Sequence, residues 1–178
     1  QGCPPPEAGL SYAIFNNEDD VGELSVLVRR GDGVTTIDLL MDISISLFAI
    51  PVYKYKHRSR EIWAAGALVR SHAVSIDNGR TTKVEMKNLG ERYLVEADDG
   101  PIRTQGARLS ELLWCEALAR TGTVISTLTG GIETYPFEFI AEEALAHNGR
   151  SVAARHYRFT RKKRTGDIWY DCDGIALR

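Results

Sequence analysis

The chain has 178 residues, of which 43% are hydrophobic and 26% are charged, a composition typical of one soluble globular domain. Its net charge of −2 gives no overall attraction to nucleic acid or to anionic lipid. The longest apolar segment, residues 43–52, contains two serines and a proline and is shorter than the roughly 18 residues that a membrane-spanning helix needs. We therefore expect no nucleic-acid partner and no transmembrane segment.

The first residues indicate export. The chain starts with Gln1 instead of Met, and Gln-Gly-Cys-Pro-Pro-Pro before a folded domain is typical of a mature N-terminus. We expect a periplasmic or extracellular protein with a flexible segment over residues 1–8 and a single β-rich domain over residues 9–178. Cys3 follows a small residue, as the attachment cysteine of a lipoprotein does, which leaves a lipid anchor at Cys3 as an alternative.

Turn signals recur at short intervals, and the segments between them alternate between apolar and polar residues. The strongest hairpin signal is Asn78-Gly79. The other expected turns are Gly31-Asp32-Gly33, Ala65-Gly66, Asp99-Gly100-Pro101, Gly130-Gly131, Asn148-Gly149, Thr165-Gly166 and Asp173-Gly174. This pattern predicts a mainly β fold: one long curved antiparallel meander, an open half-barrel of about nine to eleven strands.

Residues 53–63 form a strand whose two faces differ sharply, because side chains alternate between the faces of a sheet. One face carries Tyr53, Tyr55, His57, Ser59, Glu61 and Trp63, and the other carries Lys54, Lys56, Arg58, Arg60 and Ile62. The basic face is continued by Arg70, His72, Val74, Lys83, Glu85 and Lys87 and is expected to contact solvent.

Turn chemistry predicts what lies opposite the aromatic face. A three-residue loop ending at Gly66 places Trp63 opposite Ala67 and Glu61 opposite Val69. Continued along the strands, this register sets Ser59 opposite Ser71, His57 opposite Ala73 and Tyr55 opposite Ser75, and the turn at Asn78-Gly79 sets Ser75 opposite Thr82, Ala73 opposite Val84 and Ser71 opposite Met86.

Large side chains opposite small ones leave room above the small residues, which protein or a ligand has to fill. For Tyr55 and Trp63 the alternatives are core packing and ligand contact. His57 and Glu61 lie on the order of 13 Å apart along the strand, so each needs its own partner, either in a buried network or in a binding site. The candidate ligand-binding residues are Tyr53, Tyr55, His57, Glu61, Trp63, Met86 and Trp114.

Residues 110–120 break the β pattern, with Leu113, Trp114, Ala117 and Leu118 at helical spacing. Ser110 suits the N-cap of a helix and Gly122 its C-terminal cap. We therefore expect one short helix packed on the concave face of the sheet, with Trp114 as the lid of the site.

A C-terminal hairpin near Arg164–Gly166 gives the secondary candidate site. Alternation places His156, Arg158, Trp169 and Asp171 on one face. With a two- or four-residue loop, Arg158 lies opposite Asp171 or Asp173, which suits either a substrate-orienting pair or a structural ion pair beside a packing tryptophan. The basic run over residues 161–164 is expected to be a solvated hairpin tip.

No nucleotide-binding loop, dinucleotide fingerprint, nucleophile elbow or zinc-ligand spacing occurs, so no cofactor and no metal are expected. Cys115 and Cys172 are expected to be small buried hydrophobic residues, with a disulfide between them as the alternative.

Several motifs resemble an uncharacterised bacterial family of mostly exported proteins. They are Glu61-Ile-Trp63-Ala-Ala-Gly66-Ala-Leu68, Asn78-Gly79, Thr127-Leu-Thr129-Gly130, His156-Tyr157 and Trp169-Tyr170-Asp171, with Trp114 as the mid-chain tryptophan. More distantly, the layout resembles the β half-barrels of lipoprotein carriers and of the cofactor-free enzyme of the violacein pathway. That resemblance implies an apolar ligand held against a concave face.

The aromatic face leads us to expect a periplasmic or secreted binding or carrier protein for a lipophilic or aromatic small molecule. The first alternative is a cofactor-independent enzyme, with Glu61 or His57 as acid–base and Arg158 or Asp171 orienting the substrate. The second is a structural or assembly protein that pairs through an edge strand. The sequence leaves the existence of catalysis and the oligomeric state open.

Overall fold

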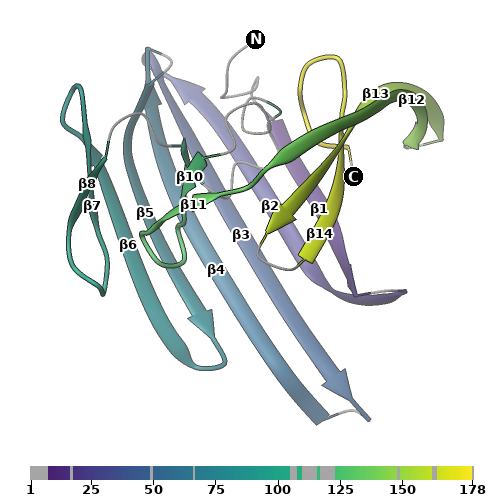
Figure 1. The fold of residues 1–178 in the computed structure, drawn as a ribbon, viewed down its shortest axis with the longest axis horizontal. Coiled ribbons are helices and arrows are strands. Elements are labelled where there is room, and N and C mark those ends of the chain that lie inside the picture. The colour runs from purple at the N-terminus through teal and green to yellow at the C-terminus, as the bar shows by residue number, and fades with distance from the viewer. Residues whose placement is uncertain are drawn as a thin grey trace. The chain divides into compact units, whose positions relative to one another are not determined.

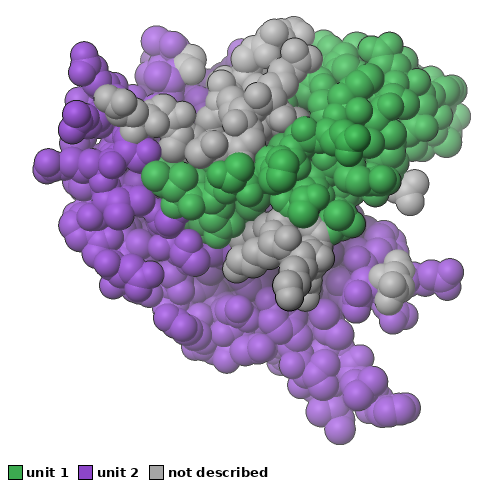
Figure 2. Space-filling view, in the orientation of Figure 1, with its two compact units in different colours: residues 1–5, 107–126, 132–178 green, residues 6–106, 127–131 purple. Residues whose placement is uncertain are grey.

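The computed structural model describes residues 8–16, 18–48, 50–65, 67–104, 108–109, 116, 123–147, 149–161 and 164–177. This part of the chain contains fourteen β-strands and no helix, which confirms a mainly β fold (Figure 1). No helix that could span a membrane occurs among the described residues. The chain divides into two compact units (Figure 2): unit 1 contains residues 1–5, 107–126 and 132–178, and unit 2 contains residues 6–106 and 127–131. The single domain stays a prediction.

Eight strands of unit 2 form one antiparallel sheet in which every strand pairs with its neighbour in the chain. They are β1 (Ala8–Asn16), β2 (Asp19–Gly31), β3 (Val34–Leu47), β4 (Ile50–Ala64), β5 (Ala67–Asp77), β6 (Arg80–Asn88), β7 (Tyr93–Glu96) and β8 (Ile102–Thr104). The edge strands β1 and β8 do not pair with each other, so the sheet is open. The predicted antiparallel meander is confirmed for this unit.

The hairpin between β5 and β6 has the predicted register. Asn78 and Gly79 have φ values of 47° and 88°, as a type I′ turn requires. Ser75 pairs with Thr82 and Ser71 pairs with Met86. The Asn78 side chain also accepts a hydrogen bond from the backbone N–H of Lys54 at 2.9 Å, which ties this turn to β4.

The hairpin between β4 and β5 differs from the prediction. Ala64 pairs with Ala67, so the loop is one residue shorter than expected, and a bulge in β5 at Val69 adds one unpaired residue. Trp63 therefore lies opposite Leu68, and Glu61 lies opposite Ser71. Beyond the bulge the pairing is shifted by two residues, so Ser71, Ala73 and Ser75 stay on the predicted face. Before the bulge the prediction is wrong, because Leu68 is buried on that face and Ala67 and Val69 are exposed.

The two faces of β4 differ in exposure as alternation predicts. His57, Ser59, Glu61 and Trp63 are buried, and Tyr53 and Tyr55 at the other end of the same face are half-buried. On the opposite face Lys54, Lys56, Arg58 and Arg60 are exposed. The buried face joins the apolar core of the unit, whose largest members include Val26, Val28, Ile37, Leu39, Val84, Met86 and Val95.

The strands of unit 1 form two small sheets, so the expectation of one continuous meander is wrong for this part of the chain. The first sheet, in the order β11-β10-β9, consists of β9 (Arg108–Leu109), β10 (Thr123–Ile125) and β11 (Ile132–Thr134). The second consists of β12 (Phe137–His147), β13 (Arg150–Arg161) and β14 (Arg164–Tyr170). Strands β7 to β11 have only two to four residues, too few to show alternation, which is why the expected strand number was too low.

The last hairpin turns earlier than the expected Thr165-Gly166. Arg161 pairs with Arg164, and Gly166 lies within β14 opposite Phe159. A Cβ at position 166 would lie 2.5 Å from the Phe159 ring, so the glycine makes room for an aromatic ring instead of forming a turn.

Several expectations concern residues that the structure does not describe. The predicted helix over residues 110–120 lies outside the described residues except for Glu116, which is in a turn. Trp114, Cys115 and Cys3 also lie outside them. Cys172 is exposed and forms no disulfide. The expectation of a buried residue is wrong for Cys172 because β14 ends at Tyr170 and Cys172 lies in the following turn.

Candidate functional site

The imidazole of His57 lies between β3 and β5 on the buried face of unit 2. Met41 pairs with it on one side and Ser75 on the other, and His57 Nδ1 lies 2.8 Å from Ser75 Oγ. The ring is parallel to that of Tyr55, with 6.3 Å between the centroids. His57 Nε2 is buried and has no hydrogen-bond partner, and burial lowers the pKa of His57 to about 4. His57 is therefore neutral at pH 7.

Glu61 and Trp63 form a second buried pair on the same face. The indole N–H of Trp63 donates to Glu61 Oε2 at 2.7 Å, and Glu61 pairs with Ile37 on β3 and Ser71 on β5. Between the two pairs, the hydroxyl of Ser59 is buried without a hydrogen-bond partner. Trp63 thus donates to the buried side chain of Glu61. The sequence did not reveal this contact, because alternation gives the face on which a side chain lies but not its rotamer.

The predicted ligand-binding residues of unit 2 therefore share one face, as expected, and several of them are enclosed. His57, Glu61 and Met86 are each 1% exposed. A ligand that contacts them must displace the protein atoms that now cover them. Their part in ligand binding stays a prediction: His57 Nδ1 and Glu61 Oε2 have partners within the protein, whereas His57 Nε2 has none.

The opposite face of the same strands holds a groove, which we call the basic groove. It has a volume of about 970 Å³ and is built only by β2, β3, β4 and β5. Its apolar side chains are Leu27, Leu40, Ile62, Val74 and Ile76. Its basic side chains are Arg29, Lys56, Arg58, Arg60 and Arg70, and Ser25, Asp38, Leu39, Ser59 and His72 complete the lining. This volume is that of a small-molecule pocket.

Arg58 lies in the middle of the basic groove. It pairs with Leu40 on β3 and with Val74 on β5, so apolar side chains flank it on both sides. No carboxylate among the described residues forms an ion pair with Arg58. An exposed cation between two apolar side chains is suited to an anion with an apolar chain.

The other basic residues of the groove have carboxylate partners. Asp38 binds Arg29 and also Arg60, with 2.6 Å between Arg60 Nε and Asp38 Oδ1. Lys56 lies 2.9 Å from Asp42 and Arg70 lies 3.7 Å from Glu85. The sequence signal for this groove was the presence of Ile62 and Val74 on a face that is otherwise basic.

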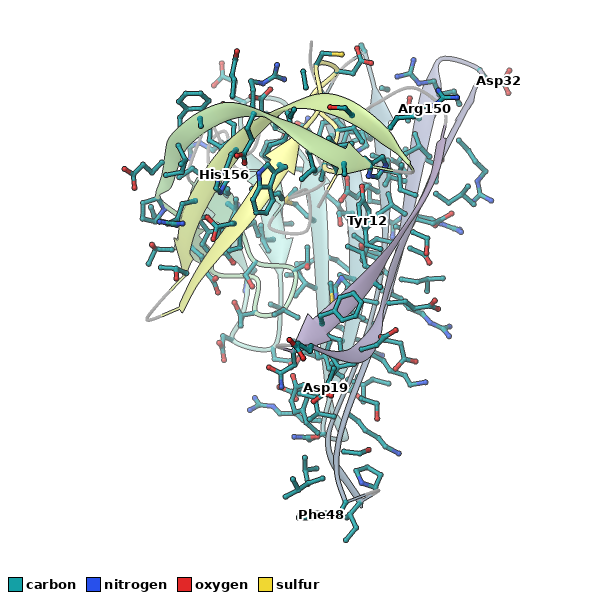
Figure 3. All side chains as sticks on the ribbon, turned by 90° about the vertical axis from the view of Figure 1, so that its right-hand side faces the viewer. Tyr12, Asp19, Asp32, Phe48, Arg150 and His156 are labelled. Carbon is teal, nitrogen blue, oxygen red and sulfur yellow. The ribbon has the colours of Figure 1, made fainter. Side chains whose placement is uncertain are left out.

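The secondary candidate forms a cluster on β13 and β14 of unit 1, where Figure 3 labels His156. The His156 ring stacks on Trp169 at 4.3 Å, and its Nε2 lies 2.9 Å from Asp167 Oδ1. Arg158 Nε donates to the same oxygen at 3.0 Å, and the His156 and Arg158 hydrogen bonds lower the pKa of Asp167. Trp169 also donates to Glu143.

Asp171 does not belong to this cluster. Its Oδ1 accepts the backbone N–H groups of Asp173 and Ile175, both at 2.9 Å, so it stabilises the turn after β14. The predicted pairing of Arg158 with Asp171 or Asp173 is wrong because Arg161 pairs with Arg164, a register that brings Asp167 opposite Arg158.

The other face of β13 carries a buried network that the sequence did not predict. Arg155 donates two hydrogen bonds to Glu116, at 2.7 and 2.8 Å, and Tyr157 donates a third at 2.8 Å. Arg155 also donates to the backbone oxygen of Asp171, and the Glu116 carboxylate raises the pKa of Arg155. Glu116 lies 39 residues before Arg155, in a segment without strand alternation, so no sequence pattern links the two.

Comparison with known proteins gives a family and a fold. The model of a family described as a domain of unknown function, DUF6134, matches residues 12–178. The crystal structure of a beta-barrel-like protein of the domain of unknown function DUF1849, from Brucella abortus, is similar with a TM-score of 0.57 and 9% sequence identity, over 87% of this chain and 79% of that one. At this identity the likeness shows the fold alone. A search of curated proteins found no similar sequence.

Proposed function

The chain belongs to the DUF6134 family, a family of unknown function, and we propose from its geometry that it binds a lipophilic anion, such as a long-chain carboxylate, in the basic groove. The observation that carries this proposal is the position of Arg58, a cation without a carboxylate partner among the described residues, between Leu40 and Val74. The groove's volume of about 970 Å³ suits one such molecule.

The physical argument has two parts. The alkyl chain loses its contact with water when it covers the exposed side chains of Leu27, Leu40 and Ile76, and each buried methylene contributes about 0.8 kcal/mol. The carboxylate forms charge-assisted hydrogen bonds with the guanidinium of Arg58, which has no competing carboxylate to displace. The two parts act on one molecule only if it is both apolar and anionic.

This proposal keeps the expected class, a binding or carrier protein for a lipophilic small molecule, and adds the ligand's charge. It also locates binding on the face opposite the predicted one. The resemblance to half-barrel lipoprotein carriers and the expected periplasmic or extracellular location agree with such a role and are part of the proposal. The enzyme alternative gains no support from Arg158 and Asp171, which bind different partners.

A displacement assay tests the proposal. The fluorescent fatty acid cis-parinaric acid is bound to the full chain and displaced by palmitate. Arg58→Gln is expected to weaken palmitate binding at least about tenfold, because it removes the one charged anchor without changing the apolar lining. Lys54→Gln is the matched control: it removes a positive charge from the same face of β4, outside the groove, and should leave palmitate affinity within about twofold.

Two further measurements keep the result unambiguous. Hexadecanol has the same chain without the charge, so it should bind the unaltered protein more weakly than palmitate does. The Arg58→Gln variant should bind hexadecanol and palmitate with equal affinity. Methyl NMR should show palmitate-induced shifts at Leu40 and Val74 in the basic groove. Shifts at Met86 with none at Leu40 would contradict the proposal and place the ligand on the buried face.

A further inference from the structure

The sheet edges of the protein differ in how they are protected. An exposed edge strand offers unpaired N–H and C=O groups to other chains, and natural proteins blunt such edges with short strands or charged residues. In the large sheet, the edge strand β8 has only three residues. In the second small sheet of unit 1, the edge strand β12 carries Glu138, Glu142 and Glu143.

The other edge of that small sheet is also protected, and those of the first are short. β14 carries Asp167 and is extended by a bridge between Tyr170 and Ala176. β9 and β11 have two and three residues. Among the described strands, β1 is therefore the one long edge without any such protection: it has nine residues and none of them is charged.

The side chains of β1 are incompletely buried. Leu10, Tyr12 and Ile14 lie on the same face as the fully buried Val26 of β2, yet all three are only half-buried. On the other face Phe15 is 60% exposed. Figure 3, which views the sheet from the side of this edge, shows Tyr12 partway along β1. An apolar row that ends half-buried at an unprotected edge is expected to continue into another strand.

We propose that β1 pairs antiparallel with β1 of a second copy of this chain, about a two-fold axis at Tyr12. The strand is complementary to itself in this register. Leu10 lies opposite Ile14 of the second copy, and Ser11 lies opposite Ala13. Both pairs are repeated by the symmetry, so the half-buried apolar row of each copy is continued by that of the other.

The same register places Phe15 opposite Gly9 of the second copy. Nothing in the chain lies within 4 Å of the position that a Cβ at Gly9 would take, so the space above this glycine is open. The protein already contains one such pair, because the Phe159 ring covers Gly166 across β13 and β14. An aromatic ring over a cross-strand glycine shields backbone that the glycine leaves exposed.

Charge does not oppose pairing with a second copy. The protein has a net charge of −2, so two copies repel each other weakly, and the pairing strands themselves bring no charge to the contact. A single pair of strands buries a small area, so the dimer is expected to dissociate readily and to depend on concentration.

Sedimentation velocity of the full chain from about 10 µM to about 1 mM should show a monomer–dimer equilibrium. Ala13→Lys introduces two lysines beside the axis and should weaken the dimer at least about tenfold. Ala144→Lys is the matched control, since Ala144 is also an exposed alanine on an edge strand, β12, and its variant should dimerise as the unaltered chain does. A monomer throughout, or a dimer that Ala13→Lys leaves intact, would overturn the proposal.

Crosslinking tests the register independently. Directly opposite residues of an antiparallel pair have Cα atoms about 4.5 to 5.5 Å apart, within the range of a disulfide. In a background with Cys3, Cys115 and Cys172 all replaced by serine, Tyr12→Cys should therefore give a covalent dimer on mild oxidation. Phe48→Cys, at a site that is 92% exposed in the β3–β4 turn, should not do so above the background of the parent chain. Equal crosslinking of the two variants would reject the two-fold axis at Tyr12.

Discussion

At the scale of single residues, His57 gives the sharpest prediction. Its pKa in the folded protein is about 4, below the ordinary 6.5, because burial disfavours the charged ring. As the pH falls below 6.5, the unfolded chain takes up a proton that the folded chain does not, so the free energy of unfolding decreases by about 1.4 kcal/mol per pH unit until the folded pKa is reached. The total loss attributable to His57 is about 3 kcal/mol.

Urea unfolding at pH 7 and pH 4.5 measures this loss. The His57→Gln variant keeps a polar group near Ser75 but cannot titrate, so its stability should fall by about 2 kcal/mol less than that of the unaltered protein over this interval. His72→Gln, which alters an exposed histidine on the neighbouring strand, should retain the full pH dependence. The same pH dependence in all three proteins would show that His57 titrates normally.

The residue scale also shows what the sequence could predict. Alternation correctly placed every second residue from Tyr53 to Trp63 on one face. Which face a side chain occupies follows from its position along its own strand and does not depend on the partner strand. The partner of His57 could not be predicted, because a shorter loop and a bulge at Val69 moved Ser75 into the place expected for Ala73. The basic groove was missed because its hollow shape depends on how four strands twist together, which no single strand encodes.

At the scale of elements, the network on β13 predicts a contrast between neighbouring arginines. Arg155 binds Glu116, whose side chain is 8% exposed, whereas Arg158 forms a pair with Asp167 at the surface. Arg155→Met should destabilise the protein by about 3 kcal/mol, because a buried carboxylate loses its cation. Arg158→Met should cost less than about 1 kcal/mol in the same urea titration. Equal losses would mean that the Glu116 carboxylate is not buried in solution.

Elements were predictable where local chemistry determines them. Asn78-Gly79 formed the expected hairpin because a type I′ turn needs two consecutive residues with positive φ, which few residues other than Asn and Gly adopt readily. Thr165-Gly166 was misassigned because a glycine in a strand looks like a turn unless the covering ring, here Phe159, is known. Local sequence encodes the conformation that a glycine permits, and the partner strand decides how that freedom is used.

At the scale of the whole molecule, the path of the chain links the two units. Unit 1 receives residues 107–126 and 132–178, and the five residues between these ranges belong to unit 2. Neither unit is therefore a contiguous piece of the sequence that could be cut out with its ends free. Within unit 2, Gly130 of this short segment lies against Ala97 and Val95, so the segment packs against the large sheet at β7.

This interleaving predicts that the chain unfolds in one transition, as a single domain does. Gly130 has a φ of 74°, and a Cβ there would lie 2.5 Å from the Ala97 Cβ, so Gly130→Ala is expected to cost on the order of 2 kcal/mol. Differential scanning calorimetry should show one transition, with equal calorimetric and van't Hoff enthalpies, that moves as a whole to lower temperature in the variant.

Gly149→Ala is the control, because Gly149 also has a positive φ, of 72°, but has open space at the Cβ position. This variant carries the backbone strain without the clash and should shift the transition less. A variant profile that splits in two, with only one part shifted, would mean that the units unfold independently in spite of the shared chain path.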